Sequence, residues 1–137
     1  MSRGQILKSW LDGAENSITT AKDMLKLNHR DWSLFFCHLA IEKILKARLY
    51  KNGVDTPVTH NLVKLAKASK IGMDNKILSD LAEITTYNVS ARYDDEKRSF
   101  YKKATAPYAK KWFQICSEIY QKIKGALWLK KSLKRNT

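Results

Sequence analysis

Apolar side chains recur along the first part of the chain at alternating spacings of four and three residues. They are Leu7, Leu11, Ala14, Ile18, Ala21 and Leu25. Positions three and four apart lie on the same face of an α-helix, so this spacing predicts an amphipathic helix that packs on one side. Gly13 is the weak point of that helix, because glycine lowers helix propensity.

The next segment, from about Asp31 to Lys51, carries apolar residues on more than one face. Asp31 is a residue type that caps helix N-termini, and Asn52-Gly53 is a typical C-terminal stop. A helix that is apolar nearly all round must be covered by other elements. This segment is therefore predicted to be the central helix of the molecule.

Three further helices are expected beyond that stop. Thr59 and Asp74 are both good N-caps, and Pro107 is tolerated in a first helical turn because its missing N–H has no helical partner there. The expected helices cover residues 60–69, about 74–90 and about 107–133. No segment alternates as a strand does, and residues 91–106 have no clear period. The prediction is an all-α fold, an antiparallel up-and-down bundle of four long helices plus a short one, as a single domain over residues 1–137.

Charge is distributed unevenly along the chain. The formal net charge is +13, and the segment from Lys97 to Thr137 holds twelve basic residues against one acid, Glu118. That segment carries +11, while the first 96 residues carry only +2. A surface of one sign attracts polyanions such as RNA, DNA, an acidic partner protein or a phosphate-bearing ligand, although lysine-rich helices are also simply well solvated.

The two cysteines, Cys37 and Cys116, both fall inside apolar helical patterns. Two cysteines are too few for a disulfide framework or a zinc site, so we expect buried thiols in a reducing compartment. No apolar run reaches membrane-spanning length, and the first residues lack the apolar stretch of a signal peptide. The expected location is the cytoplasm, with no membrane partner.

On the central helix, His38, Glu42 and Lys46 follow one another at intervals of four and form a polar stripe. One interpretation is a solvated stripe with ordinary intrahelical pairs. The other is a partly buried Glu42 that needs a cationic partner from elsewhere, for which Arg92 is the candidate. His38 and Glu42 also have the spacing of metal ligands on one turn, but the sequence offers no second such pair, so neither a metal nor a cofactor is predicted.

The candidate ligand-binding residues lie after the fourth helix. Arg92 and Tyr93 could pair with a phosphate and stack on a base, or they could simply pin a surface loop to the bundle. Further along, four lysines could form a contiguous phosphate-binding face with tyrosines nearby. The full predicted set is Arg92, Tyr93, Arg98, Tyr101, Lys102, Lys103, Lys110 and Lys111.

Three motifs in this order resemble the HEPN domains of bacteria and archaea. Residues 35–47, Phe-Phe-Cys-His-Leu-Ala-Ile-Glu-Lys-Ile-Leu-Lys-Ala, are similar to the second-helix signature of that family. Thr-His-Asn-Leu at residues 59–62 resembles its Thr-His-Asp-Leu turn, and Ala-Arg-Tyr at residues 91–93 precedes the last long helix as in the family. The resemblance assigns a structural signature to His38, Glu42, Lys43, Lys46 and His60.

The resemblance implies a helical bundle, commonly a homodimer, that is associated with nucleotide or RNA binding and often encoded beside a small nucleotidyltransferase in a toxin–antitoxin pair. Many family members are ribonucleases that use an Arg and a His with four to six residues between them. This chain has no such pair, and no His follows His60. Because His is the side chain best suited to proton transfer near neutral pH, we expect a non-catalytic binding module with no catalytic residues.

Two alternatives to that function stay open. One is a ribonuclease toxin with a non-standard site built from Arg98 and either Tyr93 or Tyr101. The other is a purely structural partner of a nucleotidyltransferase.

Overall fold

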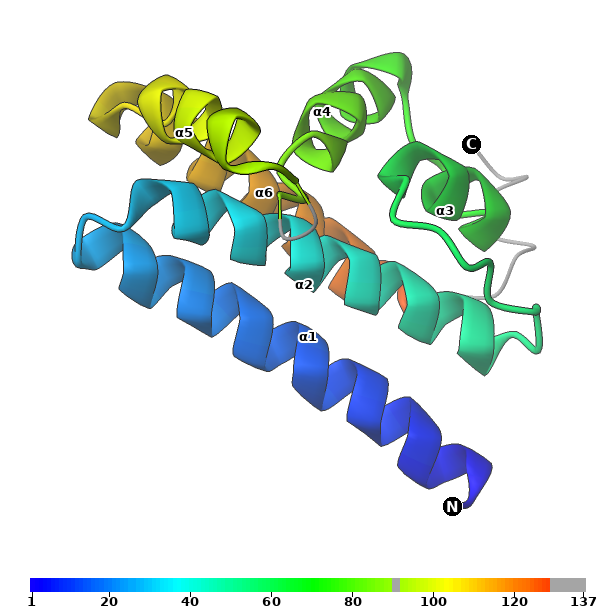
Figure 1. Ribbon diagram of the computed structural model, residues 1–137. Coiled ribbons are helices and arrows are strands. Elements are labelled where there is room, and N and C mark those ends of the chain that lie inside the picture. The colour runs from blue at the N-terminus through cyan, green and yellow to red at the C-terminus, as the bar shows by residue number, and fades with distance from the viewer. Residues whose placement is uncertain (90–91, 129–137) are drawn as a thin grey trace.

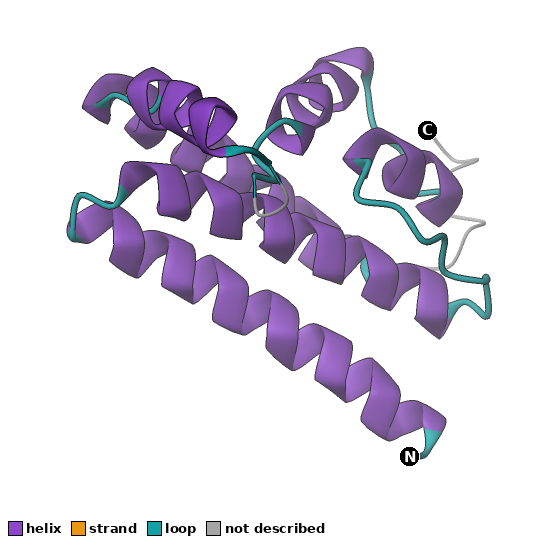
Figure 2. Cartoon of the chain, viewed as in Figure 1, coloured by secondary structure: helices purple, strands orange, loops and turns teal. Residues whose placement is uncertain are grey.

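A computed structural model describes residues 1–89 and 92–128, which form six α-helices and no strand (Figures 1 and 2). In chain order the helices are α1 (Arg3–Lys26), α2 (Arg30–Lys51), α3 (Leu62–Ser69), α4 (Asn75–Thr85), α5 (Asp94–Lys103) and α6 (Ala106–Ala126). The predicted all-α fold is confirmed. Three helices are long and three are short within the described ranges, where the sequence pattern had indicated four long helices and a short one.

The first two helices form an antiparallel hairpin (Figure 1). A capping box between Ser2 and Gln5 begins α1, and the predicted apolar stripe buries Ala14, Ile18 and Ala21 against α2. The N-cap of α2 is His29, which makes no side-chain capping bond. The prediction of Asp31 as the cap was therefore wrong; Asp31 lies in the first turn, where a carboxylate is favourable near the positive end of the helix dipole.

Helix α2 is the centre of the molecule, as predicted. It contacts all five other helices, and Figure 1 shows it between α1 and the remaining elements. Its apolar residues are buried around much of its circumference, among them Leu34, Ile41, Leu45 and Leu49. Cys37 also lies in this core, and Cys116 of α6 is buried with it, both as free thiols.

Local hydrogen bonds fix the starts of α3 and α4. The side chain of Asn61 accepts from the N–H groups of Val63 and Lys64 and is the N-cap of α3, whereas Thr59 was expected in that role. Asp74 caps α4 as predicted, through Ile77 N–H. Helix α4 ends at Thr85, several residues before the expected end near residue 90.

Helix α5 was not predicted, because residues 91–106 lack an apolar period. Phe100 is its one buried residue, so a single side chain anchors ten residues to the core. Three acids lie in its first turn and Lys102 and Lys103 in its last, an arrangement that suits the helix dipole. Thr105 caps α6, with Pro107 in its first turn. The expected extension of α6 toward Leu133 falls largely outside the described residues.

Buried side chains from all six helices pack into one hydrophobic cluster. Within residues 1–89 and 92–128, no helix combines the length and the apolar character that a membrane crossing needs.

Candidate functional site

The polar stripe of α2 faces the interior of the protein. His38, Glu42 and Lys46 keep only 1%, 5% and 9% of their surface exposed. Of the two interpretations of this stripe, the solvated one is wrong, and Glu42 is a buried carboxylate paired with the cation of Lys46.

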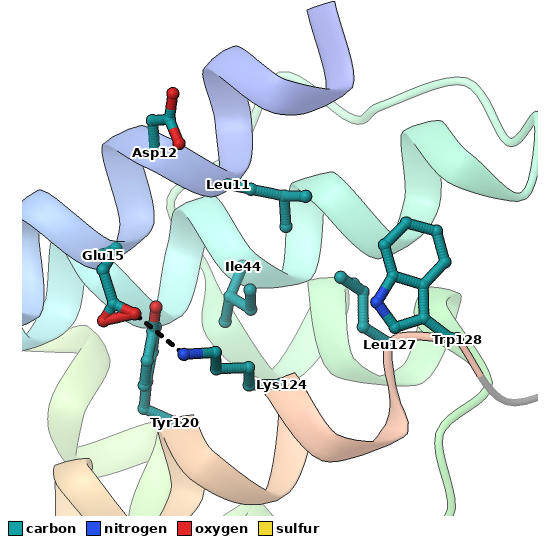
Figure 3. Close-up of a pocket in the computed structure, with 8 residues that line it drawn as sticks. All are labelled: Leu11, Asp12, Glu15, Ile44, Tyr120, Lys124, Leu127 and Trp128. Atoms are coloured by element: carbon teal, nitrogen blue, oxygen red, sulfur yellow. Dashed lines mark hydrogen bonds and ion pairs between the residues drawn. The ribbon is translucent and has the colours of Figure 1, made fainter. Parts of the chain in front are cut away.

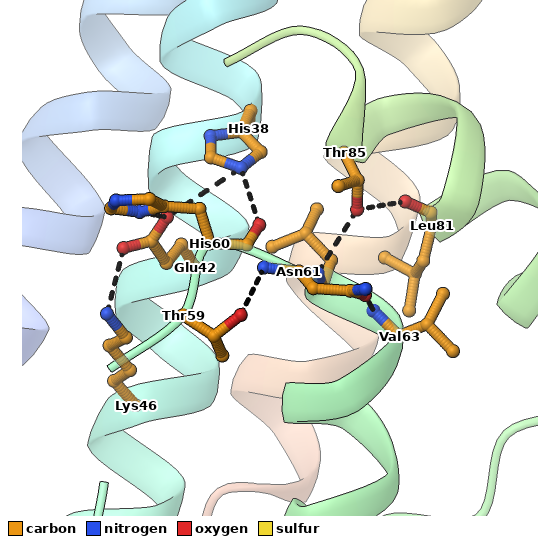
Figure 4. A network of polar contacts seen from close by, with 10 residues as sticks. His38, Glu42, Lys46, Thr59, His60, Asn61, Val63, Leu81 and Thr85 are labelled. Carbon is orange, nitrogen blue, oxygen red and sulfur yellow. Dashed lines mark hydrogen bonds and ion pairs between the residues drawn. The ribbon is translucent and has the colours of Figure 1, made fainter. Parts of the chain in front are cut away.

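Two groups donate hydrogen bonds to Glu42 (Figure 4). Lys46 Nζ donates to Glu42 Oε2 at 3.0 Å, and His60 Nδ1 donates to Oε1 at 2.9 Å. His38 Nε2 lies further from Oε1, at 3.7 Å. Arg92 was the predicted partner and is not among them; it lies against α5, in a depression shared with Phe100 and Lys103. The actual partners come from the same helix and from the segment before α3.

His38 fixes the backbone of that segment. Its Nε2 lies 3.1 Å from the carbonyl oxygen of His60, and because a carbonyl only accepts, Nε2 carries the hydrogen. The other ring nitrogen, Nδ1, is buried with no hydrogen-bond partner in the described part of the chain. Burial lowers the pKa of His38 below its ordinary value, although the His60 carbonyl and Glu42 act in the opposite direction. His38 is therefore a neutral buried imidazole that clamps the chain at His60.

The His60 ring is bound to the protein on its Nδ1 side and is otherwise largely exposed to solvent. Its side chain is 67% exposed, while Nδ1 is bound to the buried Glu42. This leaves Nε2 on the solvent side of a ring whose orientation is fixed by a carboxylate. Throughout residues 1–89 and 92–128, no three His, Cys, Asp or Glu side chains gather in a way that could hold a metal ion.

Thr59 and Asn61 shape the same segment. Thr59 Oγ1 accepts from Asn61 N–H at 3.1 Å, and the N–H of Leu62 donates to Thr85 Oγ1 of α4 at 3.1 Å. The Thr-His-Asn-Leu motif is thus a turn that connects α2, α3 and α4 (Figure 4). The remaining signature residue, Lys43, points toward α1, where its Nζ lies 3.4 Å from Ser17 Oγ.

A cluster around Glu83 joins α4, α5 and α6. Its carboxylate binds Lys103 Nζ at 2.9 Å and accepts from the hydroxyls of Tyr108 and Tyr87. Burial acts to raise the pKa of Glu83, but hydrogen bonds from Tyr108, Lys103 and Tyr87 bring it below the ordinary value. The sequence reasoning missed this cluster, although the i, i+4 spacing of Glu83 and Tyr87 was a signal for it. Lys103 is consequently ion-paired with Glu83, although its side chain stays 46% exposed.

Five other cations of this region are exposed. Lys97, Arg98 and Lys102 lie on α5, and Lys110 and Lys111 on α6; together we call them the cationic surface. Across the described residues none of the five forms an ion pair with a carboxylate, although Lys111 Nζ lies 5.9 Å from the ring centre of Trp112. Tyr93 and Tyr101 are exposed beside them. The structure thus keeps most of the predicted binding residues at the surface, and moves Lys103 into the Glu83 cluster.

The buried His38 predicts a pH-dependent stability. An unfolded chain protonates His38 near its ordinary pKa of 6.5, whereas the folded protein, in which burial lowers that pKa, takes up the proton only at lower pH. Acid therefore favours the unfolded state, and the free energy of unfolding should decrease as the pH falls from about 7 toward 5. In His38→Gln that decrease should be shallower by up to about 1.4 kcal/mol per pH unit, measured by urea unfolding at several pH values.

Glu42, Lys46 and His60 surround His38 and are unchanged in that variant. His29→Gln, at an exposed position before α2, is the matched control and should keep the wild-type pH profile. A His38→Gln profile as steep as that of the wild type would show that His38 is not the source of the acid sensitivity.

Comparison with known proteins agrees with this geometry. A crystal structure of TT1696 from Thermus thermophilus superposes with a TM-score of 0.73 at 18% sequence identity, covering 87% of this chain and 96% of that one. The crystal structure of ST0689, an archaeal HEPN homologue, gives a TM-score of 0.69 at 17% identity and covers 88% and 97% of the two chains. These likenesses show the fold. A comparison with curated proteins finds no match.

Two of the three sequence motifs therefore form one structural unit. The second-helix signature supplies the buried Glu42 and His38, and the turn at residues 59–62 supplies the His60 ring and carbonyl that they bind. A family model for the HEPN domain matches residues 7–126, which include both motifs and the helices that carry them. The chain belongs to the HEPN domain family.

Proposed function

We propose that this HEPN domain binds the phosphates of a nucleotide or RNA through the cationic surface and catalyses no reaction. The observation that supports the proposal is the set of exposed cations on two consecutive helices without carboxylate partners in the described ranges. Unpaired cations release counterions from a polyanion on binding, which is the main source of sequence-independent affinity for nucleic acids.

The charges along α5 favour phosphate binding at the C-terminal end of the helix, next to α6. Arg98 and Lys102 are one helical turn apart, and the exposed Tyr101 lies beside them as a stacking platform. The acids of the first turn, residues 94–96, repel phosphate at the opposite end. Binding is therefore expected across the C-terminal half of α5 and the first turns of α6.

The absent Arg-x4–6-His pair supports a role in binding rather than in cleavage. On the family resemblance, we further propose that the domain acts as a homodimer beside a nucleotidyltransferase in a toxin–antitoxin pair. The cationic surface would then supply RNA or nucleotide recognition to that pair.

The test is the salt dependence of binding to a fluorescently labelled single-stranded RNA, followed by fluorescence polarisation. The affinity of the wild type should fall steeply as salt rises. Lys102→Glu with Lys110→Glu should weaken binding and reduce the slope of log K against log salt by about 1.4, because each single-strand phosphate contact contributes about 0.7.

Lys64→Glu with Lys67→Glu is the matched control, since it changes the net charge equally at exposed lysines of α3. The control should bind RNA nearly as the wild type does. If both double variants lost the same amount of RNA affinity, net charge alone would explain the loss. That result would contradict the proposed binding surface. The RNA should remain full length throughout. If the wild type cleaved the RNA and a change of Arg98 or Tyr101 abolished the cleavage, the protein would be a ribonuclease and not a binding module alone.

A further inference from the structure

The ring of His60 binds the protein through only one of its two nitrogens. His60 Nδ1 lies 2.9 Å from Glu42 Oε1, and because a carboxylate only accepts, Nδ1 carries the hydrogen. Across the described residues, no hydrogen bond or ion pair involves Nε2. The neutral ring is therefore fixed in the tautomer whose lone pair is on Nε2, and 67% of the side chain is exposed to solvent.

The backbone at His60 is fixed together with the ring. The His60 carbonyl accepts from the buried His38 Nε2 at 3.1 Å. The N–H of the next residue, Asn61, donates to Thr59 Oγ1 at 3.1 Å, and the Asn61 side chain caps α3. A nitrogen nucleophile that is oriented by a carboxylate and attached to an ordered backbone needs little rearrangement before it reacts.

The charges around this ring favour an anionic reactant. His60 lies directly before the N-cap of α3, at the positive end of that helix dipole. The charge of Glu42 is compensated by Lys46 Nζ, which lies 3.0 Å from Oε2. Lys64 in the first turn of α3 is exposed, and within residues 1–89 and 92–128 it forms no ion pair with a carboxylate. A phosphoryl donor, which carries negative charge, is therefore attracted to His60.

We propose that Nε2 of His60 is a phosphoryl acceptor that is modified by phosphoramidates, the class of donor in which phosphorus is bound to nitrogen. The Nε2 lone pair forms a new bond to phosphorus while the P–N bond of the donor breaks. The donor nitrogen, which is protonated in the donor, leaves with that electron pair as a neutral amine. The product is a phosphoryl imidazolium that keeps its Nδ1 hydrogen on Glu42, in a charge-assisted hydrogen bond. The bond formed and the bond broken are both P–N bonds, so the transfer needs no further energy source.

The experiment treats the folded full chain with potassium phosphoramidate and follows each histidine by phosphorus NMR and by mass spectrometry of peptides. We expect one phosphoryl group on Nε2 of His60, formed about tenfold faster than on His29, which is exposed and has no carboxylate partner in the described ranges. His38, which is 1% exposed, should remain unmodified. His60→Gln should lose the fast reaction and keep the slow one at His29. Equal rates at His60 and His29, or modification of His60 on Nδ1, would overturn the proposal.

Glu42→Gln tests the carboxylate that orients the ring. It should slow phosphorylation of His60 to about the rate of His29, because the product imidazolium loses its counter-charge. Glu15→Gln is the matched control and should react at the wild-type rate. Glu15 pairs with Lys124 Nζ at 2.9 Å, at the rim of a pocket between α1, α2 and α6 that contains no histidine (Figure 3). A wild-type rate in Glu42→Gln would contradict the proposal.

Unfolding the wild type provides a second test that does not require Glu42→Gln to fold. In urea that unfolds the chain, His60 and His29 should react at equal rates, because the tautomer of His60 is no longer fixed. A faster reaction of His60 that persisted in urea would assign its reactivity to the local sequence and overturn the proposal.

This inference is independent of the proposed RNA binding, because His60 and Glu42 lie outside the cationic surface. Lys102→Glu with Lys110→Glu should lose RNA affinity and still be phosphorylated at the wild-type rate. Loss of fast phosphorylation in that variant would place the donor on the cationic surface and contradict the role of His60.

Discussion

Arg48→Met should lower the free energy of unfolding by roughly 3–4 kcal/mol, the largest loss we expect from a single substitution. Arg48 is 1% exposed, and its Nη1 donates to the carbonyl oxygens of Ala126 and Leu127 at 2.9 and 3.0 Å. Its Nε donates to the carbonyl of Ser69 at 3.4 Å. One guanidinium thus satisfies the C-terminal ends of α6 and α3 together.

The physical reason for so large an effect is the chemistry of helix ends. The last carbonyls of a helix have no intrahelical donor and carry the negative end of the dipole, so a buried cation is favourable there. Methionine replaces the volume of the arginine stem but donates no hydrogen bond, which leaves buried carbonyls unsatisfied. The free energy of unfolding of Arg48→Lys should lie between those of the wild type and Arg48→Met, because an ammonium keeps the charge but lacks the planar set of donors.

Urea unfolding followed by circular dichroism measures the loss. Arg3→Met is the matched control: Arg3 Nη2 donates to the carbonyl of Tyr50 at 2.9 Å, so it also serves a helix end, but at an exposed site. That variant should lose less than about 1 kcal/mol. If Arg48→Met were no more destabilised than Arg3→Met, the buried guanidinium would not hold the two helix ends.

Amphipathic periodicity predicted α1 and α2 well, because both helices bury enough apolar side chains to leave a regular pattern. Helix α5 has one buried residue, Phe100, so no apolar period could reveal it. Its first turn is acidic and its last turn basic, which is favourable for the helix dipole. The choice between Thr59 and Asn61 as the cap of α3 was equally undetermined. Both residue types cap helices, and only the fold decides which one meets the free N–H groups.

The periodicity of the sequence could not predict which side chains from different helices contact one another in the site. The sequence indicated that Glu42 needs a cation from elsewhere in the chain, but Lys46 of the same helix supplies the charge. The contact with His60 in place of Arg92 depends on the path of the chain between α2 and α3. Arg48 gave no signal either, since a basic residue near the end of a helix is commonly solvated. Its role became visible only when α2, α3 and α6 were placed together.

Glu42→Gln should lower the free energy of unfolding by about 2–3 kcal/mol, the second largest loss expected. The glutamine is nearly isosteric, so the change tests charge rather than packing. It leaves the ammonium of Lys46, which is 11% exposed at its side chain, without a counter-charge, and it leaves one acceptor oxygen where Lys46 and His60 had used two. The matched control is Glu15→Gln, whose ion pair with Lys124 is half exposed and should contribute less than about 1 kcal/mol.

A double variant shows whether the cost arises from the stranded ammonium. Breaking one member of a buried ion pair costs more than replacing both by apolar or neutral groups, because the single change leaves an uncompensated charge. Lys46→Met added to Glu42→Gln should therefore recover at least about 1 kcal/mol of the loss in urea unfolding, and the cycle should show strong coupling between the two positions. Additive effects, or a Glu42→Gln loss as small as that of Glu15→Gln, would mean that water reaches Glu42 and Lys46 and that the polar stripe of α2 is solvated after all.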